Sequence, residues 1–362
     1  MTTSENTDLT RRKFLKWSAG GLVGATGLAF GLKPWKNSTA EAVTVSQQRP
    51  AMGTFVEITA RGEKEDRLTR LIDKAYKRIK TVDESMSVFK GSSRVRRLND
   101  PETKQVDLTP DMVEVLTEAQ RISSITDGSF DATAGPLLKL WGFYDDDLSV
   151  PSETDLAETL NLVDYNGLEV DSSRGIATLP DRRSAIDLGG VAKGYGVDEA
   201  IEILKDGGAA AGLVNAGGDI RGFGTPEANR DWKVGLQHPL SEDELLGALD
   251  LILPAVTTSG NYESFFTYQG SKLAHIIDPR TGRPVEDTLS VSVLTKQAVQ
   301  ADGLSTGLFS QSAEEARATV SELDDTELIY IWKEDEQAKV EVTEGLEGEV
   351  EGSNYQRQLS LA

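Results

Sequence analysis

Residues 186–195 read Ile-Asp-Leu-Gly-Gly-Val-Ala-Lys-Gly-Tyr. The pattern predicts a strand that ends over 185–187, a turn at the two glycines, and a helix over 191–204. A helix that opens directly after two glycines presents unpaired backbone N–H groups, which favour a phosphate, and Lys193 adds positive charge. The spacing matches neither a Walker A loop nor a GxGxxG fingerprint. A tight structural turn therefore remains the alternative interpretation.

Helices and strands alternate irregularly on both sides of this stretch. Apolar residues three and four apart predict a helix over 67–82, and Thr109 followed by Pro110 is typical of the start of a second helix. Further helices are expected over 154–162, 301–310 and 313–323. Strands are expected over 43–59 with a break at 50–53, and over 213–215, 232–237, 249–253, 255–258, 289–294 and 328–332. Because strands at this density lack regular βαβ alternation, the pattern predicts an α+β fold rather than a doubly wound sheet.

The composition excludes several kinds of site. The chain has 362 residues, of which 38% are apolar and 27% charged, as is typical of a globular protein. It contains no cysteine, which excludes a disulfide framework, a cysteine-ligated metal site, a cysteine nucleophile and a lipid-modified cysteine. Its two histidines are His238 and His275, too few for a three-histidine metal site.

Acidic residues outnumber basic ones 59 to 38, which gives a net charge of −21. Such a surface repels nucleic acid and anionic lipid over most of its area, so no nucleic-acid partner is expected. We interpret the charge as a solvation device suited to high external salt, as in halophilic proteins. From Glu334 onwards the chain is acidic and poor in large apolar residues, which predicts a last strand and an acidic C-terminal tail over 336–362.

The first 42 residues predict a twin-arginine signal segment. Arg11 and Arg12 precede an uncharged apolar stretch over 17–32, shorter than the roughly 20 residues of a membrane-spanning helix. Residues 40–42, Ala-Glu-Ala, offer a small-x-small cleavage site. A buried N-terminal helix is the alternative, and an uncleaved segment would attach the protein to a membrane. Removal of residues 1–42 would leave 32 basic and 56 acidic residues, a charge of −24.

Two segments near the C-terminus carry oxygen and nitrogen donors. Asp302 and Thr306 are four residues apart at an expected helix start, so they share one helix face. This carboxylate and hydroxyl suit Mg²⁺ held jointly with a substrate phosphate, although a capping Asp302 and a surface Thr306 are the alternative. His275 stands between apolar residues, where a histidine is either packed in the core or a general base.

Taken in chain order from Met52 to Phe309, eight segments resemble the ApbE family of FAD:protein FMN transferases. These segments are Met52-Gly53-Thr54, Met86 to Phe89 with Leu98-Asn99, Asp127 to Thr133 with Trp141-Gly142-Phe143, Asp187 to Gly194, Asn215 to Asp219, Thr258-Ser259-Gly260, His275 to Gly282, and Ala301-Asp302 with Thr306. The 215–219 segment alone reads as a hairpin turn. Phe89 departs from a common FAD-stacking tyrosine, Ser129 from a usual alanine, and the lipid-anchoring cysteine of many members is missing.

The resemblance implies a single catalytic unit over 43–335, built as an α+β fold related to the T-fold, with mixed sheets and packed helices in two intimately packed subdomains. It implies that FAD and Mg²⁺ bind together. The metal would be held by the Gly190 carbonyl, the Asp302 carboxylate and the Thr306 hydroxyl. FAD would contact Met52, Phe89, Ser129, Phe130, Asp131, Asp187, Lys193 and Ile277.

The reaction implied by the resemblance transfers FMN from FAD to a Ser or Thr hydroxyl of an acceptor protein and releases AMP. His275 would take the proton from that hydroxyl. The acceptor would be an extracytoplasmic redox flavoprotein. Two alternatives stay open: hydrolysis of FAD to FMN and AMP, and a non-enzymatic flavin-binding protein.

The signal segment generates a prediction about export. Arg11→Lys combined with Arg12→Lys should leave the protein in the cytoplasm, because the twin-arginine export machinery recognises the arginine pair. Cell fractionation measures this outcome. Normal export of the double variant would contradict the assignment.

Overall fold

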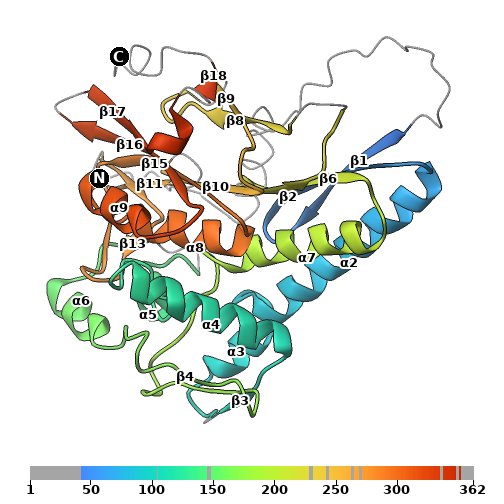
Figure 1. The fold of residues 1–362 in the computed structure, drawn as a ribbon. Helices are drawn as coiled ribbons and strands as arrows, with labels where there is room; N and C mark the ends of the chain where they lie inside the picture. Colours follow the sequence, from blue (N-terminus) through green and yellow to red (C-terminus); the bar gives the residue numbers. More distant parts are fainter. Residues whose placement is uncertain are drawn as a thin grey trace, which may run out of the picture.

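The computed structural model describes residues 42–351, apart from 104, 145–147, 228–230, 242–243, 262–264, 269–270, 335–336 and 348–349. Its main element is an eight-stranded antiparallel sheet in the order β1-β2-β6-β7-β10-β15-β16-β17 (Figure 1). The strands are β1 (Val43–Ala51), β2 (Thr54–Gly62), β6 (Ala211–Ala216), β7 (Asp219–Phe223), β10 (Ala255–Gly260), β15 (Thr288–Thr295), β16 (Glu327–Glu334) and β17 (Gln337–Val342).

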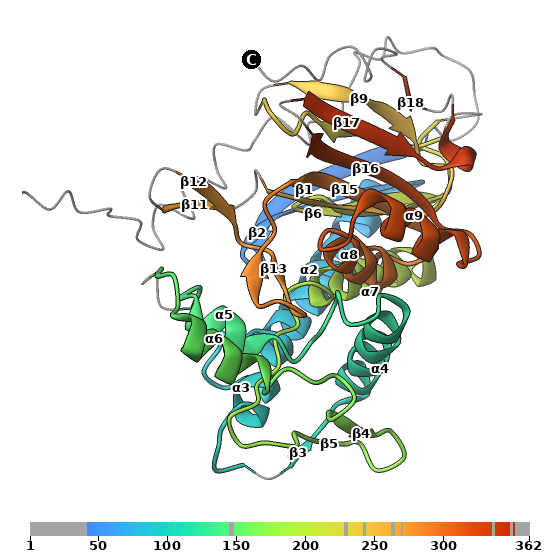
Figure 2. The same cartoon turned by 90° about the vertical axis from the view of Figure 1, so that its left-hand side faces the viewer.

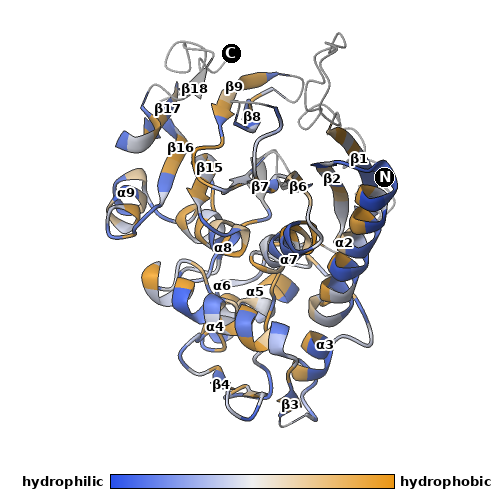
Figure 3. Ribbon diagram, turned by 45° about the vertical axis from the view of Figure 1, so that its right-hand side comes forward, coloured by the Kyte–Doolittle hydropathy of each residue, from blue (hydrophilic) through white to orange (hydrophobic). Residues whose placement is uncertain are grey.

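Helices cover one face of this sheet and a small sheet covers the other. The helices are α2 (Glu65–Met86), α7 (Ala192–Asp206) and α8 (Ala298–Leu308), with α9 (Ala313–Ser321) beside β16. The small sheet consists of β8 (Lys233–Gln237), β9 (Leu245–Asp250) and β18 (Val350–Glu351). Strand alternation explains the two layers, because Ala255 packs among the helices and Val256 packs against β8 and β9. Figure 3 shows that the outer side of α2 is hydrophilic.

A second, mostly helical subdomain lies below the helix layer (Figure 2). It consists of α3 (Arg94–Leu98), α4 (Pro110–Ile125), α5 (Gly135–Leu140), α6 (Glu153–Leu160) and a sheet of β3 (Val106–Asp107), β5 (Ile176–Thr178) and β4 (Glu169–Asp171). Leu116 and Ile122 of α4 share a buried cluster with Leu304 and Leu308 of α8. This common core confirms the predicted α+β fold of two closely packed subdomains.

Two hairpins precede β15, namely β11 (Phe265–Tyr268) with β12 (Ser271–Ala274), and β13 (Ile277–Asp278) with β14 (Arg283–Pro284). The last strand expected after Glu334 is β17, the edge of the main sheet. A short 3₁₀ turn, η1 (Glu344–Leu346), follows, and Leu346 is buried against the small sheet. The ordered structure thus continues past residue 335, the expected end of the domain.

The strand expected over 185–187 is not formed. Ala185 makes one isolated bridge to Ala134, and the chain then runs extended to the start of α7. A side chain takes the place of a neighbouring strand: Asn99 donates to the carbonyl of Ile186 and accepts from its N–H, both at 2.8 Å. The next residue, Asp187, donates its N–H to Ala132 at 2.8 Å. Loops, not a sheet, therefore position the segment that leads into α7.

No helix of the described residues is long and apolar enough to cross a membrane. The predicted signal segment lies outside the described residues except for Ala42.

The role of Asn99 generates a prediction about stability. Asn99→Ala should lower the free energy of unfolding by about 2 kcal/mol, because two hydrogen bonds to partly buried backbone groups are lost. Urea unfolding measures this loss. Asn161→Ala is the matched control, since Asn161 makes one bond, to Ala157, at the exposed end of α6. Equal losses in the two variants would contradict the role of Asn99.

Candidate active site

The turn between β1 and β2 brings Met52 to helix α7. Met52 and Gly53 have φ values of 50° and 76°, in the left-handed region that a non-glycine residue rarely adopts. A Cβ atom on Gly196 would lie 2.9 Å from the Met52 sulfur, so this side chain rests directly on α7. Gly196 is three residues after Lys193, which places the two on neighbouring positions of one helix face. The predicted FAD contact Met52 thus lies against the first turns of α7, the helix that carries Lys193.

Lys193 lies between two buried carboxylates. Its Nζ is 2.5 Å from Oδ2 of Asp219 and 3.6 Å from Oδ1 of Asp302. The other oxygen of Asp302 accepts the backbone N–H of Gly194 at 2.9 Å. Burial raises the pKa of Asp302, and the positive charge of Lys193 opposes that rise. Asp302 therefore does not cap α8, as the alternative interpretation had it; it joins α8 to α7.

The three predicted metal-binding residues come together beside this cluster. A Cβ atom on Gly190 would lie 3.0 Å from both the hydroxyl oxygen and the methyl group of Thr306. Thr306 is one turn after Asp302 on α8 and is partly exposed. No three His, Cys, Asp or Glu side chains gather around one point in the described part of the chain. A metal ion here would rely on one carboxylate and neutral oxygens, a donor set that fits Mg²⁺ when a phosphate completes it.

The predicted FAD contacts at 129–131 form a buried loop against the end of α8. Phe130 packs beside Gly190, 3.2 Å from the position of its missing Cβ. The Ser129 hydroxyl accepts from the amide of Gln311 at 3.2 Å. The Asp131 carboxylate accepts from Thr133 and from the backbone of Tyr165, and burial raises its pKa. The Asp131 carboxylate is therefore occupied by hydrogen bonds within its own loop and to Tyr165. A ligand contact of this loop would come from its backbone.

Asp187 and Phe89 are joined by a residue that the sequence analysis missed. The Tyr144 hydroxyl donates to Oδ2 of Asp187 at 2.7 Å, and the N–H of Gly189 donates to Oδ1 at 2.6 Å. The Tyr144 ring meets Phe89 edge to face, with centroids 5.9 Å apart. Phe89 is 56% exposed, more than any other of the exposed large apolar side chains in the described residues. Phe89 and Tyr144 therefore offer an aromatic surface for a flat ring, next to a fixed carboxylate.

His275 is partly buried at the junction of β12 and β13. The Ile277 side chain is buried in a cluster with Trp141, so a ligand contact at this residue would come from its backbone. Trp141 also fixes the hairpin by donating to the carbonyl of Gly282 at 2.8 Å. Arg280 donates to the carbonyl of Ser310, just beyond α8, at 2.6 Å. The His275 segment is thus attached to the helix that carries Asp302 and Thr306.

Asp219 and Tyr144 are the residues that sequence reasoning did not single out. The 215–219 segment does form the predicted hairpin turn, between β6 and β7. Its last residue, however, faces α7 and bonds to Lys193. An acidic residue directly after a Gly-Gly pair was the available signal for Asp219. Tyr144 adjoins the Trp-Gly-Phe segment, but nothing in its spacing pointed to Asp187.

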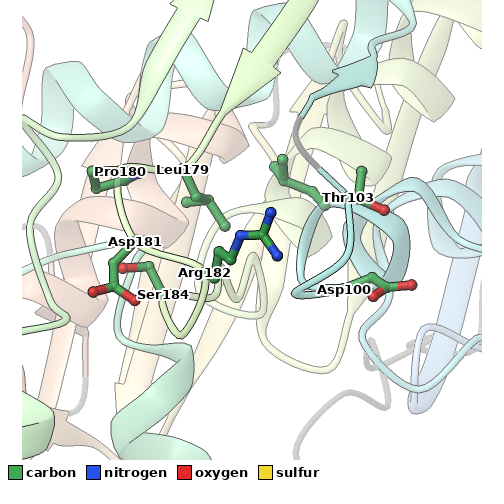
Figure 4. A pocket seen from close by; sticks show the side chains of 8 residues that line it. Asp100, Thr103, Leu179, Pro180, Asp181, Arg182 and Ser184 are labelled. Carbon is green, nitrogen blue, oxygen red and sulfur yellow. The ribbon is translucent and has the colours of Figure 1, made fainter.

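A separate hollow of about 190 Å³ lies between the end of α3 and the 179–184 loop (Figure 4). Its lining consists of Leu98, Asp100, Thr103, Leu179, Pro180, Asp181, Arg182 and Ser184. It includes none of the predicted site residues.

Comparison with known proteins gives a consistent result. Residues 52–330 match the ApbE family. The FAD:protein FMN transferase of Haemophilus influenzae is 33% identical over 240 residues, which cover 64% of this chain and 69% of that protein. The Escherichia coli protein of the same name is 31% identical over 304 residues, or 80% of this chain and 84% of that one.

Solved structures share the fold. The ApbE protein of Thermotoga maritima has a TM-score of 0.78 and 29% identity, with 84% of this chain and 98% of that chain covered. The flavin transferase ApbE from Vibrio cholerae has a TM-score of 0.74 and 27% identity, with 85% and 99% covered. The family match over most of the chain, together with these relatives, shows that the chain belongs to the ApbE family.

Proposed function

We propose that this protein is an FAD:protein FMN transferase, which moves FMN from FAD to a hydroxyl of an acceptor protein and releases AMP. One observation supports the proposal: Thr306 of α8 lies against Gly190, and Asp302 of the same helix lies 3.6 Å from Lys193, at the point where α7 begins. A helix start and a lysine attract phosphates, and the oxygen donors would suit a divalent metal that neutralises part of the phosphate charge. The names of the relatives support the same activity.

Each part of FAD has a matching part of the site. The pyrophosphate would lie at the start of α7, near Lys193. The isoalloxazine ring would stack on Phe89, whose edge-to-face contact with Tyr144 holds it in place. The Gly190 carbonyl, Asp302 and Thr306 would hold Mg²⁺, which when bound neutralises charge that develops on the phosphates.

His275 would act as the general base on the acceptor hydroxyl. A Ser or Thr hydroxyl is a weak nucleophile at neutral pH, so removal of its proton assists the attack on phosphorus. The bond from this hydroxyl to the FMN phosphorus forms as the bond to the AMP oxygen breaks, and AMP leaves. Pure flavin binding would need no base at this position.

The proposal extends to where the protein works. The twin-arginine segment supports an extracytoplasmic location, either soluble or attached through an uncleaved N-terminus, with a redox flavoprotein as acceptor. The net charge of −21 supports the proposal that the protein functions at high external salt. The export experiment on Arg11 and Arg12 tests the location.

The metal donors generate a prediction about Mg²⁺. Asp302→Ala should lower Mg²⁺-dependent FMN transfer by at least roughly 10- to 100-fold. Loss of a residue that only hydrogen-bonds to a metal ligand already costs that much, and Asp302 is proposed as a ligand itself. Incubation with FAD, Mg²⁺ and a candidate acceptor distinguishes flavinylated acceptor, free FMN with AMP, and unchanged FAD. Asp302→Asn is the control for folding, because its amide oxygen can still accept from Gly194 while it carries no charge. Wild-type transfer by Asp302→Ala at limiting Mg²⁺ would contradict the assignment.

The proposed base generates a separate prediction. His275→Ala should bind FAD nearly as well as wild type, because the phosphates are already ionised, and should lose transfer by roughly 10²–10⁴-fold. Stopped-flow transfer and FAD titration measure the two quantities. His238→Ala is the matched control, since His238 is buried and accepts from the N–H of Leu240, away from the site. Unchanged transfer by His275→Ala would place the base elsewhere.

A further inference from the structure

Helix α8 has no side-chain cap of its own, and its first two residues are buried behind an exposed Gln297. Its N-cap residue, Gln297, has the extended backbone of a cap but makes no capping bond through its side chain. Ala298 and Val299, the first two residues, are buried. The first N–H groups of a helix have no partner within the helix, and burial without a partner is costly. The start of α8 therefore needs an acceptor from elsewhere in the fold.

Asp198 of α7 supplies that acceptor. Its Oδ1 accepts the N–H of Ala298 and its Oδ2 accepts the N–H of Val299, both at 2.9 Å. Arg221 of β7 donates to the same Oδ1 at 2.9 Å. Asp198 is 6% exposed, and its negative charge at a helix N-terminus is favourable. One carboxylate thus connects α7, α8 and the sheet.

The same helix pair meets again one turn before Asp198. A Cβ atom on Gly194 would lie 2.2 Å from the carbonyl oxygen of Ala298, so the two backbones touch there. Gly194 also donates its N–H to Asp302, one turn into α8. The bonds of Asp198 therefore fix the position of α8 along the axis of α7, and the backbone contact at Gly194 fixes the distance between the two helices. Asp302 and Thr306 are carried on α8, whereas Gly190 lies just before α7.

Stability alone does not explain a buried carboxylate here. Burial raises the pKa of Asp198 from 3.8 to about 6, although Arg221 and the two N–H groups act against the rise. A raised pKa means that the folded protein holds this proton more tightly than the unfolded chain. The contribution to stability is thus complete below pH 4 and is lost as the pH rises to about 6. At neutral pH the cost of burying the ionised side chain exceeds what Arg221 and the two N–H groups return, so ionisation of Asp198 lowers stability.

We propose that Asp198 is a positioning residue that seats helix α8 and thereby sets the distance from Asp302 and Thr306 to Gly190. The inference rests on the proposed function, because it assumes that these three residues bind Mg²⁺ with FAD. Asp198 itself lies away from the proposed ligands and acts through the first turn of α8.

The charged groups around Asp198 are few. Arg221 faces it from β7 and also pairs with Glu202, one turn further along α7, at 3.1 Å. The first turn of α8 carries no acidic side chain, and Asp302 lies beyond it, bonded to Gly194. From α2, Arg78 pairs with Glu199 at 2.6 Å. Protonation of Asp198 would leave one of the first two N–H groups of α8 with a weaker acceptor. Arg221 would keep its ion pair with Glu202.

Hydrogen exchange of the FAD-free and metal-free protein tests the seating directly. Asp198→Asn should raise exchange in peptides that cover 297–303 by roughly tenfold, while peptides from β10 and β15 stay unchanged. Glu199→Gln is the matched control, since it removes the adjacent acid of α7 and leaves the start of α8 alone. Unchanged exchange over 297–303, or an equal rise throughout the protein, would overturn the proposal.

Mg²⁺ affinity tests the consequence for the site. Mg²⁺ is titrated into the FAD-saturated protein and binding is followed by flavin fluorescence. Asp198→Asn should bind Mg²⁺ about tenfold more weakly, which is the lower end of the effect of removing a residue that supports a metal ligand. Addition of Gln297→Asp, which gives α8 an exposed cap of its own, should recover most of that affinity. No loss in Asp198→Asn, or a loss without recovery, would overturn the proposal.

A pH series covers the case in which Asp198→Asn does not fold. Wild-type Mg²⁺ affinity should fall below pH 6, and Gln297→Asp alone should reduce that fall. An identical fall in both proteins would assign the titration to another group and overturn the inference. Failure of the proposed function is distinguished by Asp302→Ala: if that variant keeps full Mg²⁺ affinity, the metal site is wrong, whatever Asp198 does.

Discussion

The backbone contact between α7 and α8 is the constraint on which the site depends. A side chain on Gly194 would overlap the carbonyl of Ala298, so only glycine permits this approach. The approach lets the Gly194 N–H reach Asp302, and it places Lys193 beside the same carboxylate. The cation of Lys193 and the carboxylate of Asp302 are thus neighbours at the start of α7 because the two helix backbones touch at Gly194.

The sheet determines what lies beneath this contact. β7 presents Asp219 and Arg221 on the face toward the helices, two residues apart, as strand alternation requires. Asp219 bonds to Lys193 at the start of α7, and Arg221 bonds to Asp198 one turn later. From β10, Ser259 bonds to Ser305 of α8 at 2.9 Å. Strands and helices are therefore joined by polar pairs near the site, and by apolar packing elsewhere.

Local sequence signals predicted what local structure determines. Thr109 and Pro110 begin α4, and the helical spacing of Asp302 and Thr306 placed both on one face of α8. The strand expected over 185–187 was wrong because its backbone partner is the side chain of Asn99, 87 residues earlier in the chain. Lys193 was predicted from its place in the first turn of a helix, but its partner Asp219 becomes visible only when β7 packs under α7. Contacts between distant segments leave no periodic pattern in a single sequence.

The charge of the site differs from the charge of the chain. A net charge of −21 repels an anionic ligand at long range, and that repulsion extends about 10 Å at 0.1 M salt but only about 3 Å at 1 M. Lys193 acts at contact distance from two buried carboxylates, where screening is weak. Those carboxylates in turn offset the positive charge that Lys193 would present to an anion. The electrostatic potential at the start of α7 is therefore determined by the balance of charge within this cluster, and the acidic surface contributes to it mainly at low salt.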